Sequence, residues 1–140
     1  MQRDAPFDSR TTEHPMKLAL FLALSASAHA APPDSFFRAL HVVETGGKRG
    51  AILGDGGRAL GPLQIHRGYH ADARIAGDYS RCADLDYSRR VVSAYLQRYA
   101  PQAWAAGDVE TLARIHNGGP RGDKKQATIP YAAKVLRAMR

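Results

Sequence analysis

The sequence predicts a single, mainly helical domain that follows an export signal. Apolar residues recur at helical spacing in four segments, and glycine pairs or a proline follow three of them. The only long apolar run lies before residue 31 and is too short to cross a bilayer. The four predicted helices are residues 34–45, 86–99, 109–116 and 129–139.

The first thirty residues have the organisation of a secretory signal. Residues 1–15 are polar and show no apolar period, whereas Met16-Lys17 opens an apolar run that ends in Ala28-His29-Ala30. A basic residue, a short apolar core and Ala-x-Ala form a signal peptide, with cleavage after Ala30. We therefore expect residues 1–30 to be an N-terminal extension plus signal peptide, with Met16 as an alternative start. A buried N-terminal helix is the other interpretation of the apolar run.

The chain is basic and has one cysteine. It carries 20 Lys and Arg against 13 Asp and Glu, a net charge of +7. This surplus favours an anionic partner, and a bacterial wall suits an exported protein, although charge can also serve solubility alone. No nucleic-acid-binding signature accompanies the charge. Cys82 has no partner for an intramolecular disulfide, so we expect a buried small residue, with a free thiol or a dimer bridge as alternatives.

The first predicted helix places an acid at its end. Asp34 or Ser35 is a suitable N-cap, and Gly46-Gly47 stops the helix just after Glu44. Burial beside the apolar stripe and the negative end of the helix dipole would both raise the pKa of Glu44. An acid that is still protonated near neutral pH can donate a proton to a leaving oxygen, as glycoside cleavage requires.

A second acid follows on a flexible turn. Asp55 lies in Gly54-Asp55-Gly56-Gly57, where glycines allow backbone amides to turn toward a carboxylate and keep it ionised. If the turn faces Glu44, the two match the acid and the nucleophile of a retaining glycosidase, whose carboxyl groups lie about 5 Å apart. The alternative is a surface glutamate at a helix end and an aspartate that only forms a turn.

The next stretch carries two histidines. Pro62 is a residue preferred at the first helical position, so we expect a short helix from Pro62 that presents His66 and His70 on one face. No third ligand follows at the spacing of a zinc site, and we expect no metal. Gln64 and His66 are candidates to line a cleft, with packing or surface roles as alternatives.

The second half of the chain is mostly core. Tyrosine and valine rows in residues 86–99 predict a buried helix that Pro101 ends, with Trp104 in the following loop, where it either caps the core or lines a sugar site. Asp108 is the expected N-cap of the next helix. Thr128 is the expected cap of the last one.

Several short motifs, in this order, resemble the invertebrate-type lysozyme family. They are Glu44-Thr-Gly-Gly, the Asp55 glycine turn, Gly61-Pro-Leu-Gln-Ile65, residues 113–120 (Ala-Arg-Ile-His-Asn-Gly-Gly-Pro) and residues 131–135 (Tyr-Ala-Ala-Lys-Val). The resemblance covers roughly residues 36–138. The single cysteine departs from the family, whose animal members are densely cross-linked, so the loops are expected to differ more than the fold.

The resemblance implies a mainly α (α+β) lysozyme-like fold with a small β-hairpin beside the active-site cleft. It implies that residues 31–140 cleave peptidoglycan between N-acetylmuramic acid and N-acetylglucosamine, with Glu44 as acid and Asp55 as nucleophile or stabiliser. The expected substrate-binding residues are Gln64, His66, His116, Asn117, Gly118 and Tyr131.

The expected partners follow from the same resemblance. We expect a secreted or periplasmic monomer that binds glycan strands and is open to a proteinaceous lysozyme inhibitor. No cofactor, nucleic acid or stable membrane insertion is expected. A lytic transglycosylase that uses Glu44 alone and a non-catalytic glycan-binding protein remain as alternatives.

Overall fold

The computed structural model describes residues 31–140, and the predicted signal peptide lies outside the described residues. The described part contains six α-helices, four 3-10 segments and three short strands. In chain order they are α1 (Asp34–Thr45), β1 (Leu53–Gly54), η1 (Asp55–Gly57), β2 (Ala59–Leu60), β3 (Ile65–His66), α2 (Arg67–Ala73), η2 (Tyr79–Ala83), α3 (Leu85–Tyr99), α4 (Pro101–Ala106), α5 (Val109–Gly118), η3 (Gly122–Lys124), η4 (Gln126–Thr128) and α6 (Ile129–Ala138).

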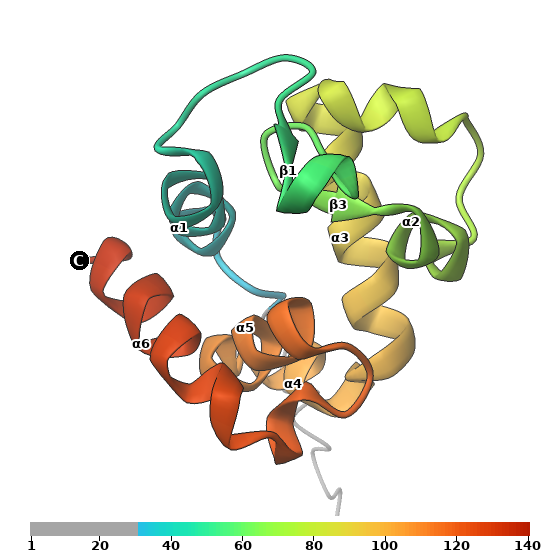
Figure 1. Cartoon of the computed structure of the whole chain (residues 1–140). Coiled ribbons are helices and arrows are strands. Elements are labelled where there is room, and N and C mark those ends of the chain that lie inside the picture. Colours follow the sequence, from blue (N-terminus) through green and yellow to red (C-terminus); the bar gives the residue numbers. More distant parts are fainter. Residues whose placement is uncertain (1–30) are drawn as a thin grey trace, which may run out of the picture.

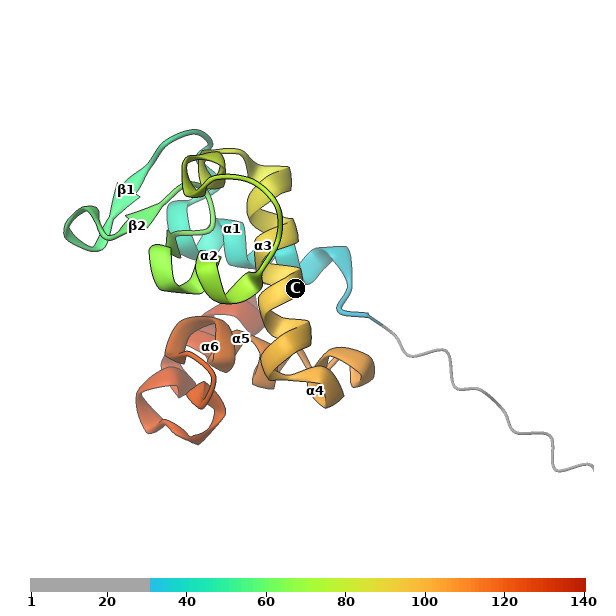
Figure 2. The same cartoon turned by 90° about the vertical axis from the view of Figure 1, so that its right-hand side faces the viewer.

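Helices α2, α4 and α5 pack against α3, α6 packs against α1 and α5, and the strands project from one side. The antiparallel sheet has the order β1-β2-β3, and Asp55 lies in the connection between β1 and β2. Figure 1 shows α1 beside α6, with α4 and α5 grouped below the sheet. Seen from the side, the hairpin of β1 and β2 extends away from the helices (Figure 2). The predicted mainly helical fold with a small hairpin around Asp55 is confirmed.

The core is built around one face of α3. Tyr87, Val91, Val92 and Leu96 are fully buried, as the four-residue spacing predicts. They pack in one cluster with apolar residues of α1, α5 and α6. Cys82 is free and fully buried, and burial raises the pKa of its thiol to about 11. The core is therefore held by packing, without a disulfide in the described part of the chain.

The start of α1 differs from the prediction. Pro33 occupies the N-cap position, and no side chain caps the helix. Asp34 instead accepts from Arg38 one turn later and from Arg89 on α3. The predicted cap was wrong because two guanidinium groups compete for this carboxylate. The end is as predicted: Gly46, with φ of 64°, accommodates the left-handed C-cap.

The helix predicted from Pro62 is also wrong. Gly61 has φ of 84°, and a Cβ there would lie 1.7 Å from the carbonyl oxygen of Cys82, so the chain turns at this point. The turn joins β2 to β3, and helix α2 starts only at Arg67. His66 and His70 therefore lie on a strand and a helix, and His70 Nε2 is 2.8 Å from the Tyr87 hydroxyl.

Pro101 begins a helix where the sequence predicted a loop. Proline is favoured in the first helical turn, so the residue that ends α3 also starts α4. Trp104 is thus helical, and its ring meets Phe37 edge to face at 6.4 Å, so it caps the core, the first of its two predicted roles. Asp108 caps α5 as predicted, since its Oδ1 accepts from the Thr111 amide at 3.1 Å.

Thr128 precedes α6 but does not cap it with its side chain. Its buried hydroxyl lies 2.7 Å from the carbonyl oxygens of Gly122 and Lys125, and it accepts from Arg114 Nε at 3.0 Å. Thr128 thus occupies the predicted N-cap position, but its side chain does not cap the helix because the loop before α6 uses the hydroxyl instead. Within residues 31–140, no helix has the length and apolarity needed to cross a membrane.

Candidate active site

One hollow of about 430 Å³ holds both predicted acids. A volume of this size suits a small-molecule site. It opens between the hairpin and the ends of α1 and α5. Its lining residues are Glu44, Asp55, Ala59, Gln64, His66, Tyr69, His116, Asn117 and Gly119.

Glu44 is held by two residues distant in the sequence. It lies in the last turn of α1, and its side chain is only 18% exposed. The Tyr131 hydroxyl of α6 donates to Oε1 at 2.5 Å, and His116 Nε2 of α5 is 3.4 Å from the same oxygen. Both of these contacts fall on the same oxygen, Oε1.

The predicted direction of the Glu44 pKa is wrong. Burial raises this pKa, as expected, but His116, the Tyr131 hydroxyl and the nearby His66 together lower it below the ordinary value of 4.5. Hydrogen bonds to the carboxylate, and the positive charge that an imidazole carries when protonated, favour the ionised form of Glu44 and outweigh the loss of water. Burial and the Glu44 carboxylate, in turn, raise the pKa of Tyr131, which stays protonated and donates.

A second layer of contacts lies behind His116. Its Nδ1 is 2.9 Å from the hydroxyl of Tyr69 on α2. The Tyr69 ring stacks on Tyr95 of α3, with ring centroids 3.6 Å apart and planes tilted by 14°. Burial is the main reason why the pKa of Tyr69 lies well above its usual range. A series of side-chain contacts thus links the end of α1 to α5, then α5 to α2, and then α2 to α3.

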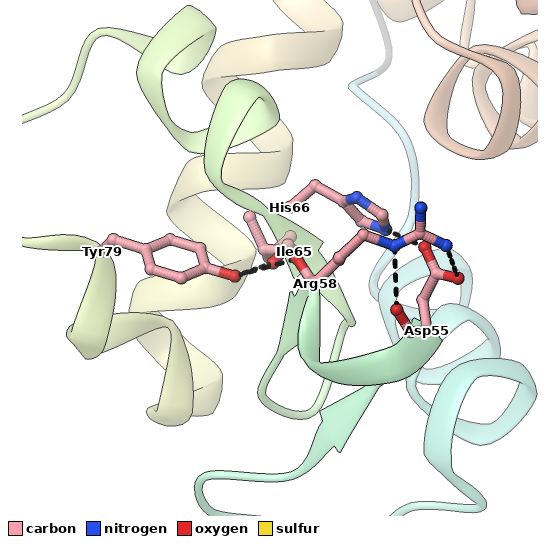
Figure 3. A network of polar contacts seen from close by, with 5 residues as sticks. All are labelled: Asp55, Arg58, Ile65, His66 and Tyr79. Carbon is pink, nitrogen blue, oxygen red and sulfur yellow. Dashed lines mark hydrogen bonds and ion pairs between the residues drawn. The ribbon is translucent and has the colours of Figure 1, made fainter.

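The Asp55 carboxylate is held by the side chains of Arg58 and His66. Arg58 Nη2 is 2.6 Å from Oδ1, and His66 Nε2 is 3.3 Å from Oδ2 (Figure 3). Arg58 Nε also donates to the backbone carbonyl of Asp55 at 3.0 Å. The sequence predicted backbone amides as partners of this carboxylate. That was wrong because the turn places the Arg58 side chain, three residues later, across it.

The strand that carries His66 is anchored from outside the hairpin. The Tyr79 hydroxyl donates to the carbonyl oxygen of Ile65 at 2.7 Å, as Figure 3 shows. Ala59 of β2 pairs with His66 in the sheet. These contacts fix the backbone from which His66 reaches Asp55.

Gln64 lines the hollow and shapes the turn below it. It has φ of 51°, and its Nε2 donates to the carbonyl oxygens of Gly61 and Ile52 at 2.9 and 3.2 Å. A Cβ on Gly54 would lie 1.7 Å from Gln64 Oε1, so this side chain fits only because residue 54 is a glycine. The Gln64 amide therefore has a structural function at the edge of the hollow.

The C-terminal end of α5 and Gly119 after it supply one wall of the hollow. Asn117 is exposed and lines the hollow, together with Gly119, whose φ is 84°. Gly118 faces Thr128 instead of the hollow: a Cβ on Gly118 would lie 2.5 Å from the Thr128 side chain. Its carbonyl oxygen accepts from Lys125 Nζ at 2.6 Å. The predicted Gly118 thus supports the wall that Gly119 forms.

Two residues of the site did not appear among the sequence candidates. Tyr69 has no motif around it, and only the fold brings it to His116. Arg58 could have been found, because it lies three residues after Asp55 on the same turn.

A second hollow in the described chain lacks such a pair of acids. It encloses about 630 Å³ beside α4 and α5, and its two acids are engaged: Asp108 caps α5 and Asp123 pairs with Lys124 at 3.1 Å. Within residues 31–140, no three His, Cys, Asp or Glu side chains are grouped to hold a metal ion.

Comparison with known proteins places the chain in a family. No protein-family model matches the sequence. An invertebrate-type lysozyme of Ruditapes philippinarum is 33% identical over 93 residues, which are 64% of this chain and 68% of that protein. The chain belongs to the invertebrate-type lysozyme family. The predicted family resemblance is therefore confirmed.

Further invertebrate lysozymes agree in sequence and in fold. Lysozyme 1 of Crassostrea virginica is 42% identical over 79 residues, 55% of this chain and 43% of that protein. The Meretrix lusoria lysozyme, solved in complex with PliI of Aeromonas hydrophila, superposes with a TM-score of 0.65 and 29% identity over 76% of this chain and 89% of that chain. The chain spans about half the length of several lysozymes that it matches, from 43% to 64%.

Proposed function

We propose that this invertebrate-type lysozyme is an exported muramidase. It hydrolyses the β-1,4 bond between N-acetylmuramic acid and N-acetylglucosamine in peptidoglycan, with Glu44 as general acid and Asp55 as nucleophile or stabiliser. The observation that supports this most directly is the hollow that holds both carboxylates, one nearly buried and one exposed. Two acids in such different surroundings suit two different roles.

The reaction divides between the two acids. Glu44 gives its proton to the glycosidic oxygen as the bond to the anomeric carbon breaks, and Asp55 stabilises or bonds the electron-poor carbon that remains. Water then attacks that carbon and passes a proton back to Glu44. The sum is one water consumed and one glycosidic bond cleaved, and Glu44 returns to its acid form.

The lowered pKa of Glu44 sets the pH range in which the proposed enzyme would be active. A general acid works only while it is protonated, and the surroundings of Glu44 favour its ionised form. Activity should therefore be greatest in acidic solution and fall as pH rises through the pKa of Glu44.

One observation favours the lytic transglycosylase as a second candidate. Each carboxylate oxygen of Asp55 already has a partner, Arg58 on Oδ1 and His66 on Oδ2. An aspartate held in this way has less freedom to bond a sugar carbon. In that case Glu44 would act alone, and a hydroxyl group of the sugar would close a 1,6-anhydro ring.

The glycan strand would lie along the hollow. We propose that Gln64, His66 and Asn117 line its path, with His116 and Tyr131 acting through Glu44 and Gly118 through the backbone of the wall. The same opening is the place where a proteinaceous inhibitor would bind. The complex of the Meretrix lusoria lysozyme with PliI motivates that part of the proposal.

Residues 31–140 would be the exported domain, and residues 1–30 its extension and signal peptide. This part of the proposal depends on the sequence pattern alone. We propose a secreted or periplasmic location and a monomeric protein.

Replacing Glu44 with glutamine tests the assignment. Gln keeps an oxygen for Tyr131 and loses the proton, so Glu44→Gln should fold normally and reduce peptidoglycan cleavage on the order of 100-fold or more. Glu110→Gln is the matched control, because Glu110 is an exposed residue of α5 outside the hollow. A Glu44→Gln protein that releases sugar ends from purified peptidoglycan as fast as the Glu110→Gln protein would disprove the role of Glu44.

A further inference from the structure

A line of side chains runs from the centre of the molecule to the acid. Tyr95 stacks on Tyr69, Tyr69 reaches Nδ1 of His116 at 2.9 Å, and Nε2 of His116 lies 3.4 Å from Oε1 of Glu44. These residues come from α3, α2, α5 and α1, so four helices hold the line in place. The His116 side chain is 5% exposed and cannot turn freely toward water.

Whether the Tyr69 hydroxyl donates to His116 or accepts from it decides which ring nitrogen of a neutral His116 carries the hydrogen. A neutral imidazole carries one N–H, and the other nitrogen is an acceptor. The Tyr69 hydroxyl stays protonated and can donate to Nδ1, which places the ring hydrogen on Nε2, toward Glu44. With the opposite tautomer, the Nε2 lone pair would face the Glu44 carboxylate, which is unfavourable in a buried site.

We infer that Tyr69 is a positioning residue that fixes the Nε2–H tautomer of His116. His116 then donates toward Oε1 of Glu44, beside the Tyr131 hydroxyl, and Oε2 is left to carry the proton that is transferred to the substrate. This inference depends on the proposed function for its catalytic meaning, whereas the tautomer itself does not.

Two other side chains also lie near Glu44. Tyr131 of α6 donates to Oε1, and His66 of β3 faces Glu44 across the hollow, where it also approaches Asp55. None of these is removed when the Tyr69 hydroxyl is removed. A change caused by Tyr69→Phe therefore reports on His116 and Glu44.

The tautomer can be measured directly by nitrogen-15 NMR of the histidine rings at neutral pH. His116→Gln identifies the His116 signals by their loss. We expect the Nε2–H tautomer in the wild-type protein and a mixture of tautomers in Tyr69→Phe, which keeps the ring that stacks on Tyr95. The Nδ1–H tautomer or an imidazolium in the wild-type protein, or an unchanged tautomer in Tyr69→Phe, would overturn the inference.

Kinetics test the consequence for the acid. Tyr69→Phe should lower kcat about fivefold to tenfold, the effect of one ordinary hydrogen bond, with KM little changed. The alkaline limb of its pH profile should move to higher pH, because Glu44 loses a donor to its ionised form. Tyr99→Phe, a tyrosine of α3 that lines the other hollow, should leave both unchanged.

The two proposals fail in different ways. A wild-type protein that cleaves no peptidoglycan at any pH would disprove the proposed function, while the NMR result would still stand. An active wild-type protein whose kcat and pH profile are unaffected by Tyr69→Phe would disprove the positioning role alone.

Discussion

The hydrogen bond from Tyr131 to Glu44 should make a measurable, pH-dependent contribution to stability. Tyr131→Phe removes only the hydroxyl that donates to Oε1 at 2.5 Å. A hydrogen bond to a charged group contributes about 1.5–3 kcal/mol, so we expect the free energy of unfolding at neutral pH to fall by about that amount. His116 remains beside the same oxygen and keeps the loss from being larger.

The pH dependence identifies the carboxylate as the acceptor. The folded-state pKa of Glu44 is lowered, so its contribution is present above the unfolded-state pKa and is lost as pH falls through the folded-state pKa. The difference between wild type and Tyr131→Phe should therefore shrink in increasingly acidic buffers, when urea unfolding is followed by circular dichroism. Tyr99→Phe serves as control. A stability difference that is absent, or equally large at all pH values, would refute this explanation.

Two further expectations concern the turn and the charge. In thermal unfolding, Gly61→Ala should destabilise the protein by more than ~1–2 kcal/mol, the cost of the left-handed backbone conformation alone, because the added Cβ would also meet the Cys82 carbonyl oxygen. Gly68→Ala is the control and should be tolerated, because the space around Gly68 is open. Binding to purified walls should weaken with added salt, which shortens the electrostatic range to about 8 Å at physiological ionic strength; sedimentation with walls would measure it, and salt-independent binding would exclude a role for the positive charge.

The parts of the fold that depend on local patterns could be predicted from the sequence. The helix before Glu44 follows from an apolar stripe and a glycine stop, and α3 follows from its rows of tyrosine and valine. The turn at Gly61 could not be predicted, since what requires it is the carbonyl of Cys82, a contact made only in the folded chain. Pro101 shows a different difficulty, because proline both ends one helix and suits the first turn of the next.

The candidate site shows the same division. The sequence indicated Glu44 and Asp55, and the fold brings both to one hollow. The direction of the Glu44 pKa was wrong because it depends on Tyr131, 87 residues away, and on His116, which burial of the helix end alone does not reveal. Tyr69 was missed for the same reason, because its proposed role depends on a contact with His116, which is 47 residues away in the sequence.

Analysis of the cleavage products tests the proposed hydrolysis most directly. Mass spectrometry of the muropeptides released from purified peptidoglycan separates ordinary reducing ends from 1,6-anhydro ends by the mass of one water. If Asp55 stabilises the anomeric carbon until water attacks, the products carry reducing ends and Asp55→Asn loses most of its turnover. Anhydro products, together with an Asp55→Asn protein that remains active, would contradict the muramidase mechanism and assign the cleavage to Glu44 alone.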